Sequence, residues 1–159
     1  MHLYFVCWGN ICRSPMAERI AQECAREHLT ASELEELSIE SFGVSSEELG
    51  NPIDHRARVE LRRHGIDADN HRARQITEHD VREADLIIAA EDFHLERLRA
   101  LGAREDQIAL VTDFVPGADA GDPLPDPWYG GAENFTSTMN VLNEAMPRIF
   151  AAVKERLQA

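Results

Sequence analysis

VCWGNICRSPMAE, residues 6–18, is the stretch that decides the fold. The apolar run that leads into it, HLYFVC at 2–7, fits a buried strand. Ser14 and Pro15 are typical of a helix start, because a serine can cap the first turn and a proline needs no N–H donor there. The chain is therefore predicted to pass from strand to helix through a short loop that begins at Cys7.

This loop has the features of an anion site. Cys7 and Arg13 stand in the pattern Cys-x5-Arg-Ser. A loop that curls from a strand into a helix can aim the N–H groups of residues 8–13 at one centre, with the positive end of the helix dipole behind them. We expect Gly9 to supply the unusual dihedral angles of the curl, and Asn10 tolerates left-handed geometry. The pattern predicts a phosphate-binding loop.

The side chains of the loop suit nucleophilic chemistry. A cysteine on the floor of such a nest is favoured as the thiolate, which is the reactive form. Arg13 offers a planar fork for two phosphoryl oxygens, and the Ser14 hydroxyl can stabilise the sulfur. Together they favour attack on phosphorus through a phosphocysteine intermediate. Cys7 and Cys12 as buried structural cysteines, or as half of a zinc site, are the alternatives, although no further Cys or His follows at zinc-ligand spacing.

Such a reaction needs a general acid for the leaving oxygen and a base for the attacking water. Asp126, in the run PDPWYGG, is the best candidate because two prolines restrict its backbone. Trp128 and Tyr129 beside it can form walls for a flat aromatic ring. Asp-Pro is also a common turn pair, so a purely structural Asp126 stays open, with Asp113 and Asp122 as weaker candidates for the acid.

The rest of the chain alternates between strand and helix patterns. Strands are predicted at 39–45, 84–91 and 107–112, and helices at 51–66, at 92–102 and, bent by Pro147, from 132 onward. Alternation of this kind implies right-handed βαβ units and ligand binding beyond the carboxyl ends of the strands. We expect one α/β domain over 1–159, a three-layer sandwich with a four-stranded parallel sheet, helices on both faces and the phosphate-binding loop after the first strand.

Composition limits the possible partners and the compartment. The chain has 159 residues and a net charge of -13, which argues against binding nucleic acid or an anionic membrane. Its start, MHLYFVCWG, has no basic leader, and no window has the ~20 apolar residues that span a bilayer. Three cysteines, all before residue 25, make no disulfide framework. We therefore expect a cytoplasmic protein with free thiols.

Over nearly its whole length the chain resembles the low-molecular-weight protein tyrosine phosphatases. Besides the opening motif, the runs that carry the resemblance are GNPIDHRA (50–57), RHGI (63–66), HRARQIT (71–77) and PDPWYGG (125–131). The resemblance implies the fold, a four-stranded parallel α/β sandwich. It also implies an enzyme that hydrolyses phosphotyrosine with no metal and no cofactor. It assigns Cys7 as nucleophile, Arg13 as phosphate clamp and Asp126 as general acid and base. The implied phosphate-binding loop consists of Trp8, Gly9, Asn10, Ile11, Cys12 and Ser14.

The resemblance also implies residues around this loop. Ser41 and His71 would join Asn10 and Ser14 in hydrogen bonds that hold the loop in shape, and Cys12 would form a reversible disulfide with Cys7. The implied substrate walls are Glu47, Trp128 and Tyr129.

Some positions depart from, or are informative within, the family pattern. Family members often carry an aromatic residue at the position of Glu47. Trp128 replaces a tyrosine, which leaves Tyr129 as the candidate regulatory phosphosite. Ile11 stands where the similar arginine-phosphatase branch carries threonine, and this favours phosphotyrosine as substrate.

The implied partner is a phosphotyrosine-containing protein, for example a tyrosine kinase, and we expect a monomer. An alternative function on the same scaffold is a small-thiol-coupled arsenate reductase, which needs only the first cysteine. The thioredoxin-coupled kind needs later cysteines, and none follows Cys24, which we expect in the core on the apolar face of a helix. A non-catalytic, flavodoxin-like phosphate-binding module is the third hypothesis.

Overall fold

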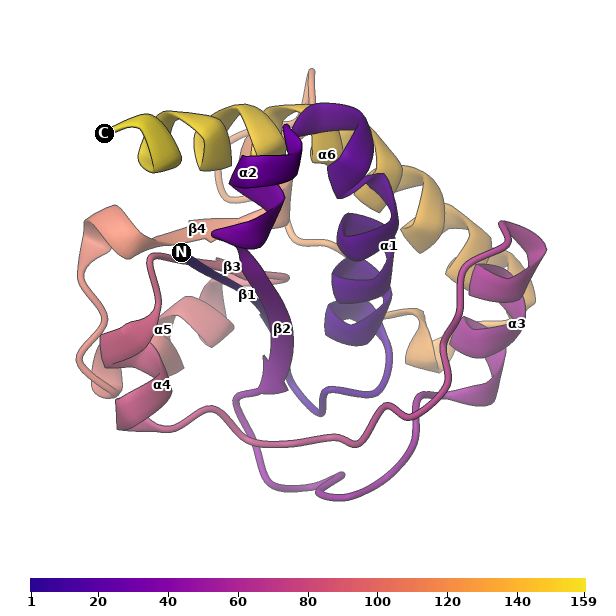
Figure 1. Cartoon of the computed structure of the whole chain (residues 1–159). Helices are drawn as coiled ribbons and strands as arrows, with labels where there is room; N and C mark the ends of the chain where they lie inside the picture. The colour runs from indigo at the N-terminus through magenta and orange to yellow at the C-terminus, as the bar shows by residue number, and fades with distance from the viewer.

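The computed structural model describes residues 1–159 and shows a four-stranded sheet between two layers of helices (Figure 1). All neighbouring strands are parallel, and their order across the sheet is β2-β1-β3-β4. The predicted α/β sandwich with a four-stranded parallel sheet is therefore confirmed. The strands are β1 (His2–Cys7), β2 (Ser38–Gly43), β3 (Leu86–Ala89) and β4 (Ile108–Leu110).

Helices cover both faces of the sheet. Leu3, Phe5 and Cys7 of β1 point into one hydrophobic cluster, and Tyr4 and Val6 point into another on the opposite face. Since both faces are buried, β1 is buried at every position from Leu3 to Cys7 rather than at alternate ones. The first cluster is closed by α1 (Arg13–His28), α3 (His55–Arg63) and α6 (Ala132–Gln158), and the second by α4 (Glu78–Glu83) and α5 (Asp92–Ala100).

Two helix starts differ from the prediction. The helix expected from residue 51 begins at His55, because the Asp54 carboxylate caps it by accepting a hydrogen bond from the Arg56 N–H. Helix α1 begins at Arg13 with Cys12 as its N-cap and no capping side chain, so the prediction of Ser14 as the cap is wrong. Ser14 instead lies inside the first turn, where its hydroxyl is free to bind other groups.

Other boundaries follow from local chemistry. The strand expected at 107–112 ends at Leu110 because residues 111–114 form a 3-10 turn, and the one expected at 84–91 is confined to 86–89. The second strand covers 38–43 instead of 39–45. Gly65 takes a left-handed φ of 72° just after α3, as expected of a stop signal. Helix α6 continues through Pro147.

Two short helices were not predicted, α2 (Ala31–Glu35) and α4. Each starts with a capping box, Thr30 with Glu33 and Thr77 with Asp80. They are too short for a hydrophobic period to show in the sequence.

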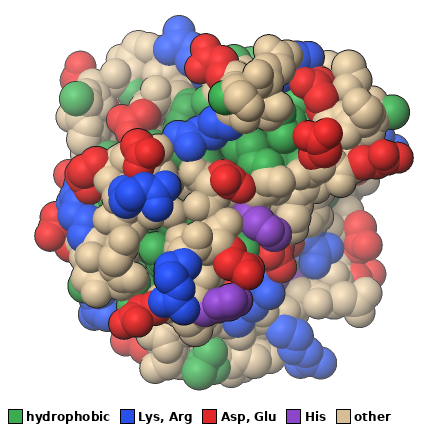
Figure 2. Space-filling model, turned by 60° about the vertical axis from the view of Figure 1, so that its left-hand side comes forward, with side chains coloured by type: hydrophobic (Ala, Val, Ile, Leu, Met, Phe, Trp, Pro, Cys, Tyr) green, Lys and Arg blue, Asp and Glu red, His purple; other side chains and the backbone are tan.

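The surface is mixed in charge. On the face shown in Figure 2, acidic and basic side chains are interspersed rather than gathered by sign. None of the helices combines the length and the apolar composition that a membrane-spanning segment needs.

Candidate active site

The loop between β1 and α1 curls at Asn10. Asn10 has a left-handed φ of 62°, whereas Gly9 has no positive φ. Our expectation that Gly9 supplies the unusual backbone geometry is therefore wrong. Gly9 is instead a point of close approach, because a Cβ there would lie 3.0 Å from Cγ of Glu48.

Gly43, at the end of β2, lets this loop approach the sheet. A Cβ on Gly43 would lie 2.7 Å from the carbonyl oxygen of Trp8 and 3.2 Å from the nitrogen of Asn10. Real side chains do not approach backbone atoms so closely, so the position requires glycine. The sequence pattern of a strand gave no sign of this requirement.

A buried hydrogen-bond network holds Asn10. Its Nδ2 donates to the hydroxyls of Ser14 at 2.9 Å and Ser41 at 3.0 Å. Its Oδ1 accepts from the Arg74 N–H at 3.0 Å, and its backbone oxygen lies 2.6 Å from Nε2 of His71. A carbonyl can only accept, so Nε2 carries the proton. Burial lowers the pKa of His71 below its usual value, which keeps the ring neutral.

The network continues into helix α1. The Ser41 hydroxyl donates to Oε1 of Glu18 at 2.9 Å, and both residues are buried. Sequence reasoning missed Glu18, whose only sign is a carboxylate on the otherwise apolar face of this helix.

Cys7 lies beneath the loop. Its sulfur is 3.0 Å from the Ser14 hydroxyl and 3.4 Å from the Ser14 backbone nitrogen. Cys12 is buried, and burial together with the nearby Asp54 carboxylate raises the pKa of its thiol. All three cysteines are free, and Cys24 is half-buried against the main core. The two cysteines of the loop therefore lie in different environments.

Arg13 is locked in place from one side. Its Nη1 donates to Oε2 of Glu91 at 2.7 Å and to the carbonyl oxygen of Leu124 at 2.6 Å. Its Nη2 lies 3.7 Å from Oδ2 of Asp126. The side chain is 2% exposed, so it cannot swing into solvent. Glu91 was not predicted, although it ends an apolar run at the carboxyl end of a strand.

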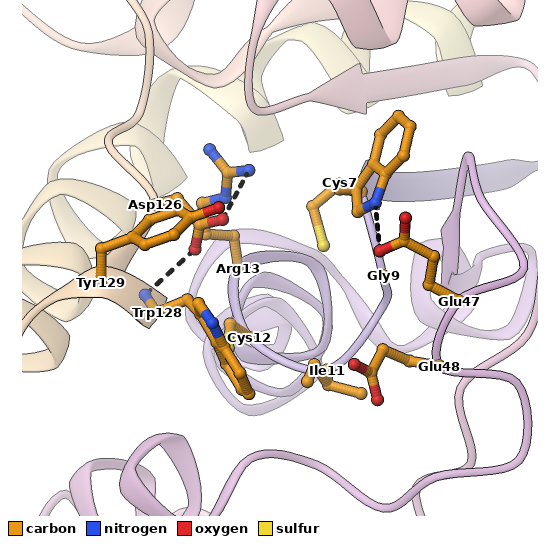
Figure 3. Close-up of a pocket in the computed structure, with 11 residues that line it drawn as sticks. Cys7, Gly9, Ile11, Cys12, Arg13, Glu47, Glu48, Asp126, Trp128 and Tyr129 are labelled. Atoms are coloured by element: carbon orange, nitrogen blue, oxygen red, sulfur yellow. Dashed lines mark hydrogen bonds and ion pairs between the residues drawn. The ribbon is translucent and has the colours of Figure 1, made fainter.

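Asp126 stands in a tight turn. Its Oδ1 accepts from the Trp128 N–H at 3.1 Å, and the carboxylate faces Arg13 (Figure 3). The two weaker candidates for the acid lie elsewhere, since Asp113 accepts from the Leu110 N–H and Asp122 from the Asp119 N–H, and neither lines the pocket.

These residues surround one pocket of about 390 Å³. Figure 3 shows Asp126 and Tyr129 on one side of it and Glu47 and Glu48 on the other, with the Cys7 sulfur between. The predicted residues of the loop and the walls line this pocket, with the exception of Asn10 and Ser14. These two belong to the hydrogen-bond network behind the loop. The lining consists of Cys7, Trp8, Gly9, Ile11, Cys12, Arg13, Glu47, Glu48, Asp126, Trp128 and Tyr129.

Trp8 takes part in a cluster on the acidic side of the mouth. Its Nε1 donates to Oε2 of Glu47 at 2.9 Å. The Arg97 guanidinium lies 5.0 Å from the centre of its ring, and Phe93 is 5.8 Å away. Glu47 thus contributes to the pocket wall by fixing the Trp8 indole through this hydrogen bond.

No group of three or more His, Cys, Asp or Glu side chains is arranged to hold a metal ion.

Comparisons of the sequence with known proteins point to one family. Residues 2–159 match the family model described as "Low molecular weight phosphotyrosine protein phosphatase". The chain is 38% identical over 161 residues to the low molecular weight protein-tyrosine phosphatase A of Mycobacterium tuberculosis, which covers 99% of this chain and 94% of that protein.

Solved structures with a similar fold include protein tyrosine phosphatases. A protein tyrosine phosphatase from Entamoeba histolytica, crystallised with Hepes in the active site, has a TM-score of 0.86 at 30% identity and covers 98% of this chain and 97% of that one. The crystal structure of YfkJ from Bacillus subtilis also has a TM-score of 0.86, at 31% identity over 98% of this chain and 96% of that one.

Proposed function

The chain belongs to the low-molecular-weight phosphotyrosine protein phosphatase family, and from this premise we propose that it hydrolyses phosphotyrosine in proteins through a phosphocysteine intermediate on Cys7. Membership confirms both the resemblance and the predicted enzyme class, a protein-tyrosine phosphatase. The observation that carries the proposal is the convergence of the Cys7 sulfur, the Arg13 guanidinium and the Asp126 carboxylate on one pocket.

The phosphate would be bound by the backbone N–H groups of the loop and by Arg13. Because Nη1 of Arg13 is bonded to Glu91 and to the Leu124 carbonyl, its Nε and Nη2 edge is the one left to meet two phosphoryl oxygens. A fixed guanidinium needs little reorganisation as charge develops on those oxygens in the transition state.

Two displacements complete the reaction. The Cys7 thiolate attacks phosphorus, a sulfur–phosphorus bond forms and the bond to the aryl oxygen breaks, while protonated Asp126 gives its proton to the leaving tyrosine oxygen. Water then attacks the phosphocysteine, Asp126 takes its proton, and phosphate leaves with the thiolate restored. The Ser14 hydroxyl, 3.0 Å from the sulfur, donates a hydrogen bond to the departing thiolate.

Hydrolysis of p-nitrophenyl phosphate and of a phosphotyrosine peptide, in the presence of EDTA, tests the proposal. We expect turnover by the wild type, none by Cys7→Ser, and a loss of about 10² to 10⁴-fold for Asp126→Ala, the range of general acid catalysis. Full activity of Cys7→Ser overturns the proposal.

A substrate panel tests the finer specificity. Ile11 lines the pocket, and Trp128 and Tyr129 wall it with aromatic faces, which favours a flat phosphoaryl group over phosphoserine or phosphoarginine. The arsenate reductase alternative predicts that arsenate turnover with a small thiol exceeds phosphatase turnover. Four further points remain predictions: a cytoplasmic location, a monomeric state, a tyrosine kinase as substrate and a regulatory role of Tyr129.

A further inference from the structure

The turn that carries Asp126 has a fixed end toward Leu124. The Leu124 N–H donates to the Ala90 carbonyl at 2.9 Å, and the Leu124 carbonyl accepts from Nη1 of Arg13 at 2.6 Å. From Pro125 onward the chain leaves these contacts. The Asp126 carboxylate is held by the Trp128 N–H and faces Nη2 of Arg13, so its direction also depends on where the segment after Asp126 lies.

Arg56 holds that segment. Its Nη1 donates to the carbonyl oxygens of Trp128 at 3.2 Å and Gly130 at 3.0 Å. It is the only side chain that hydrogen-bonds the backbone of residues 125–131 from outside that segment. Its guanidinium also lies 5.3 Å from the ring centre of Trp128 and 4.6 Å from that of Phe135, in the first turn of helix α6.

The other edge of the same guanidinium is anchored. Its Nε and Nη2 donate to the two carboxylate oxygens of Asp54, each at 3.1 Å. The hydrogen bond to Asp54 raises the pKa of Arg56 above its usual value, so the fork stays charged. The Asp54 N–H donates at 2.8 Å to the carbonyl oxygen of Ile11. One side chain thus connects the phosphate-binding loop, through Asp54, to the segment that bears Asp126.

We propose that Arg56 is a positioning residue: it fixes the Asp126 turn relative to the phosphate-binding loop and so sets the distance from the acid to the leaving oxygen. This inference rests on the proposed function for the role of Asp126. A lysine cannot replace the arginine, because one ammonium group cannot bind a carboxylate through two donors, bind two carbonyls and lie over two rings.

The kinetic test compares leaving groups. We compare kcat/KM, which reports the first displacement, for the wild type, Arg56→Lys and Arg56→Met on two esters. The phenolate that leaves from phenyl phosphate needs a proton from the general acid. The dinitrophenolate that leaves from 2,4-dinitrophenyl phosphate does not. Since a misplaced catalytic group costs on the order of 10²-fold, we expect a loss of about tenfold or more on phenyl phosphate and less than about threefold on the dinitrophenyl ester. The inhibition constant of inorganic phosphate should stay unchanged, because the phosphate-binding loop is intact.

Two controls separate positioning from general damage. Arg62→Met, an exposed arginine on the same helix, should match the wild type on both esters. In an Asp126→Ala background, Arg56→Met should add no further selective loss, because the two changes remove the same function. Equal losses on both esters, or additive losses in the double variant, overturn the inference.

A second readout needs no activity. The chain has two tryptophans, so Trp8→Phe leaves Trp128 as the only one. We expect Arg56→Met in that background to increase acrylamide quenching of Trp128 fluorescence, with Arg62→Met unchanged. If the wild type hydrolyses no phosphate ester, the proposed function fails, and quenching still decides whether Arg56 holds the turn. Unchanged quenching overturns the inference. If Arg56→Met does not fold, Arg56→Lys is measured in its place.

Discussion

Cys12 and Cys7 belong to one loop, but their surroundings give them different reactivity. Cys12 is buried, and its thiol pKa is raised by that burial and by Asp54. Cys12 is therefore mostly a thiol at neutral pH, and its fraction of thiolate grows about tenfold with each unit of pH. Both cysteines line the pocket, but the Cys7 sulfur is the one hydrogen-bonded to the Ser14 hydroxyl and placed for attack on phosphorus.

Peroxide oxidation should show this difference. Peroxide transfers an oxygen to the Cys7 sulfur, giving a sulfenic acid, and the Cys12 sulfur then attacks it to form the disulfide and release water. Because the attacking thiolate is scarce at low pH, we expect more Cys7–Cys12 disulfide and less sulfonic acid at pH 9 than at pH 7, measured by mass spectrometry. Cys12→Ser should lose this protection, and Cys24→Ser should keep it. Sulfonic acid on Cys7 with Cys12 intact at both pH values contradicts the prediction.

Between elements, Gly43 controls how closely β2 and the phosphate-binding loop meet. In Gly43→Ala the new Cβ would meet the Trp8 carbonyl at 2.7 Å, and neither backbone can move without breaking the sheet or the loop. We expect a loss of roughly 1–3 kcal/mol in the free energy of unfolding and weaker phosphate binding. Gly9→Ala meets only the flexible side chain of Glu48 and should lose less stability in the same urea titration. Equal losses contradict the reasoning.

The start of helix α5 adds a pH dependence of stability. The Glu91 N–H donates to Nδ1 of His94, a fully buried ring. Burial, followed by the Arg13 charge, lowers the pKa of His94 to about 3. Since the unfolded chain binds the proton near pH 6.5, the stability from this residue is complete above pH 6.5 and is lost as pH falls from there towards 3.

His94→Asn tests this contribution, because an asparagine oxygen can still accept from the Glu91 N–H. The free energy of unfolding of the wild type should fall more steeply with acid than that of the variant, by about 1 kcal/mol per pH unit below 6.5. Urea titrations between pH 5 and pH 7.5 measure the difference. Parallel curves for the two proteins contradict the prediction.

Across the whole molecule, the sequence predicted what is local or periodic. The apolar run at β1, the spacing of Cys7 and Arg13 and the alternation of strands with helices suffice for the sheet and its first loop. The sequence did not predict that Glu91, Glu48 and Arg56 belong to the site, because their roles come from contacts between segments far apart in the chain. Arg56, for example, falls in the helix predicted at 51–66, and only the fold brings it to the carbonyls of Trp128 and Gly130.

The overall charge also bears on substrate choice. The chain carries a net charge of -13, and Glu47 and Glu48 stand at one side of the pocket mouth (Figure 3), while Arg13 is paired with Glu91. Acidic residues that flank a phosphotyrosine would therefore be repelled at the mouth and over longer range, and basic ones attracted.

We expect a phosphotyrosine peptide with lysine flanks to be hydrolysed with about tenfold higher kcat/KM than the same peptide with glutamate flanks, at low ionic strength. The ratio should shrink as salt screens these exposed charges. Glu47→Gln with Glu48→Gln should reduce it, because glutamine removes the charge while an amide oxygen can still accept from the Trp8 indole. Glu155→Gln, an exposed change near the end of α6, serves as the control and should leave the ratio close to that of the wild type. A ratio near one in the wild type, or one that salt does not change, contradicts an electrostatic choice of substrate.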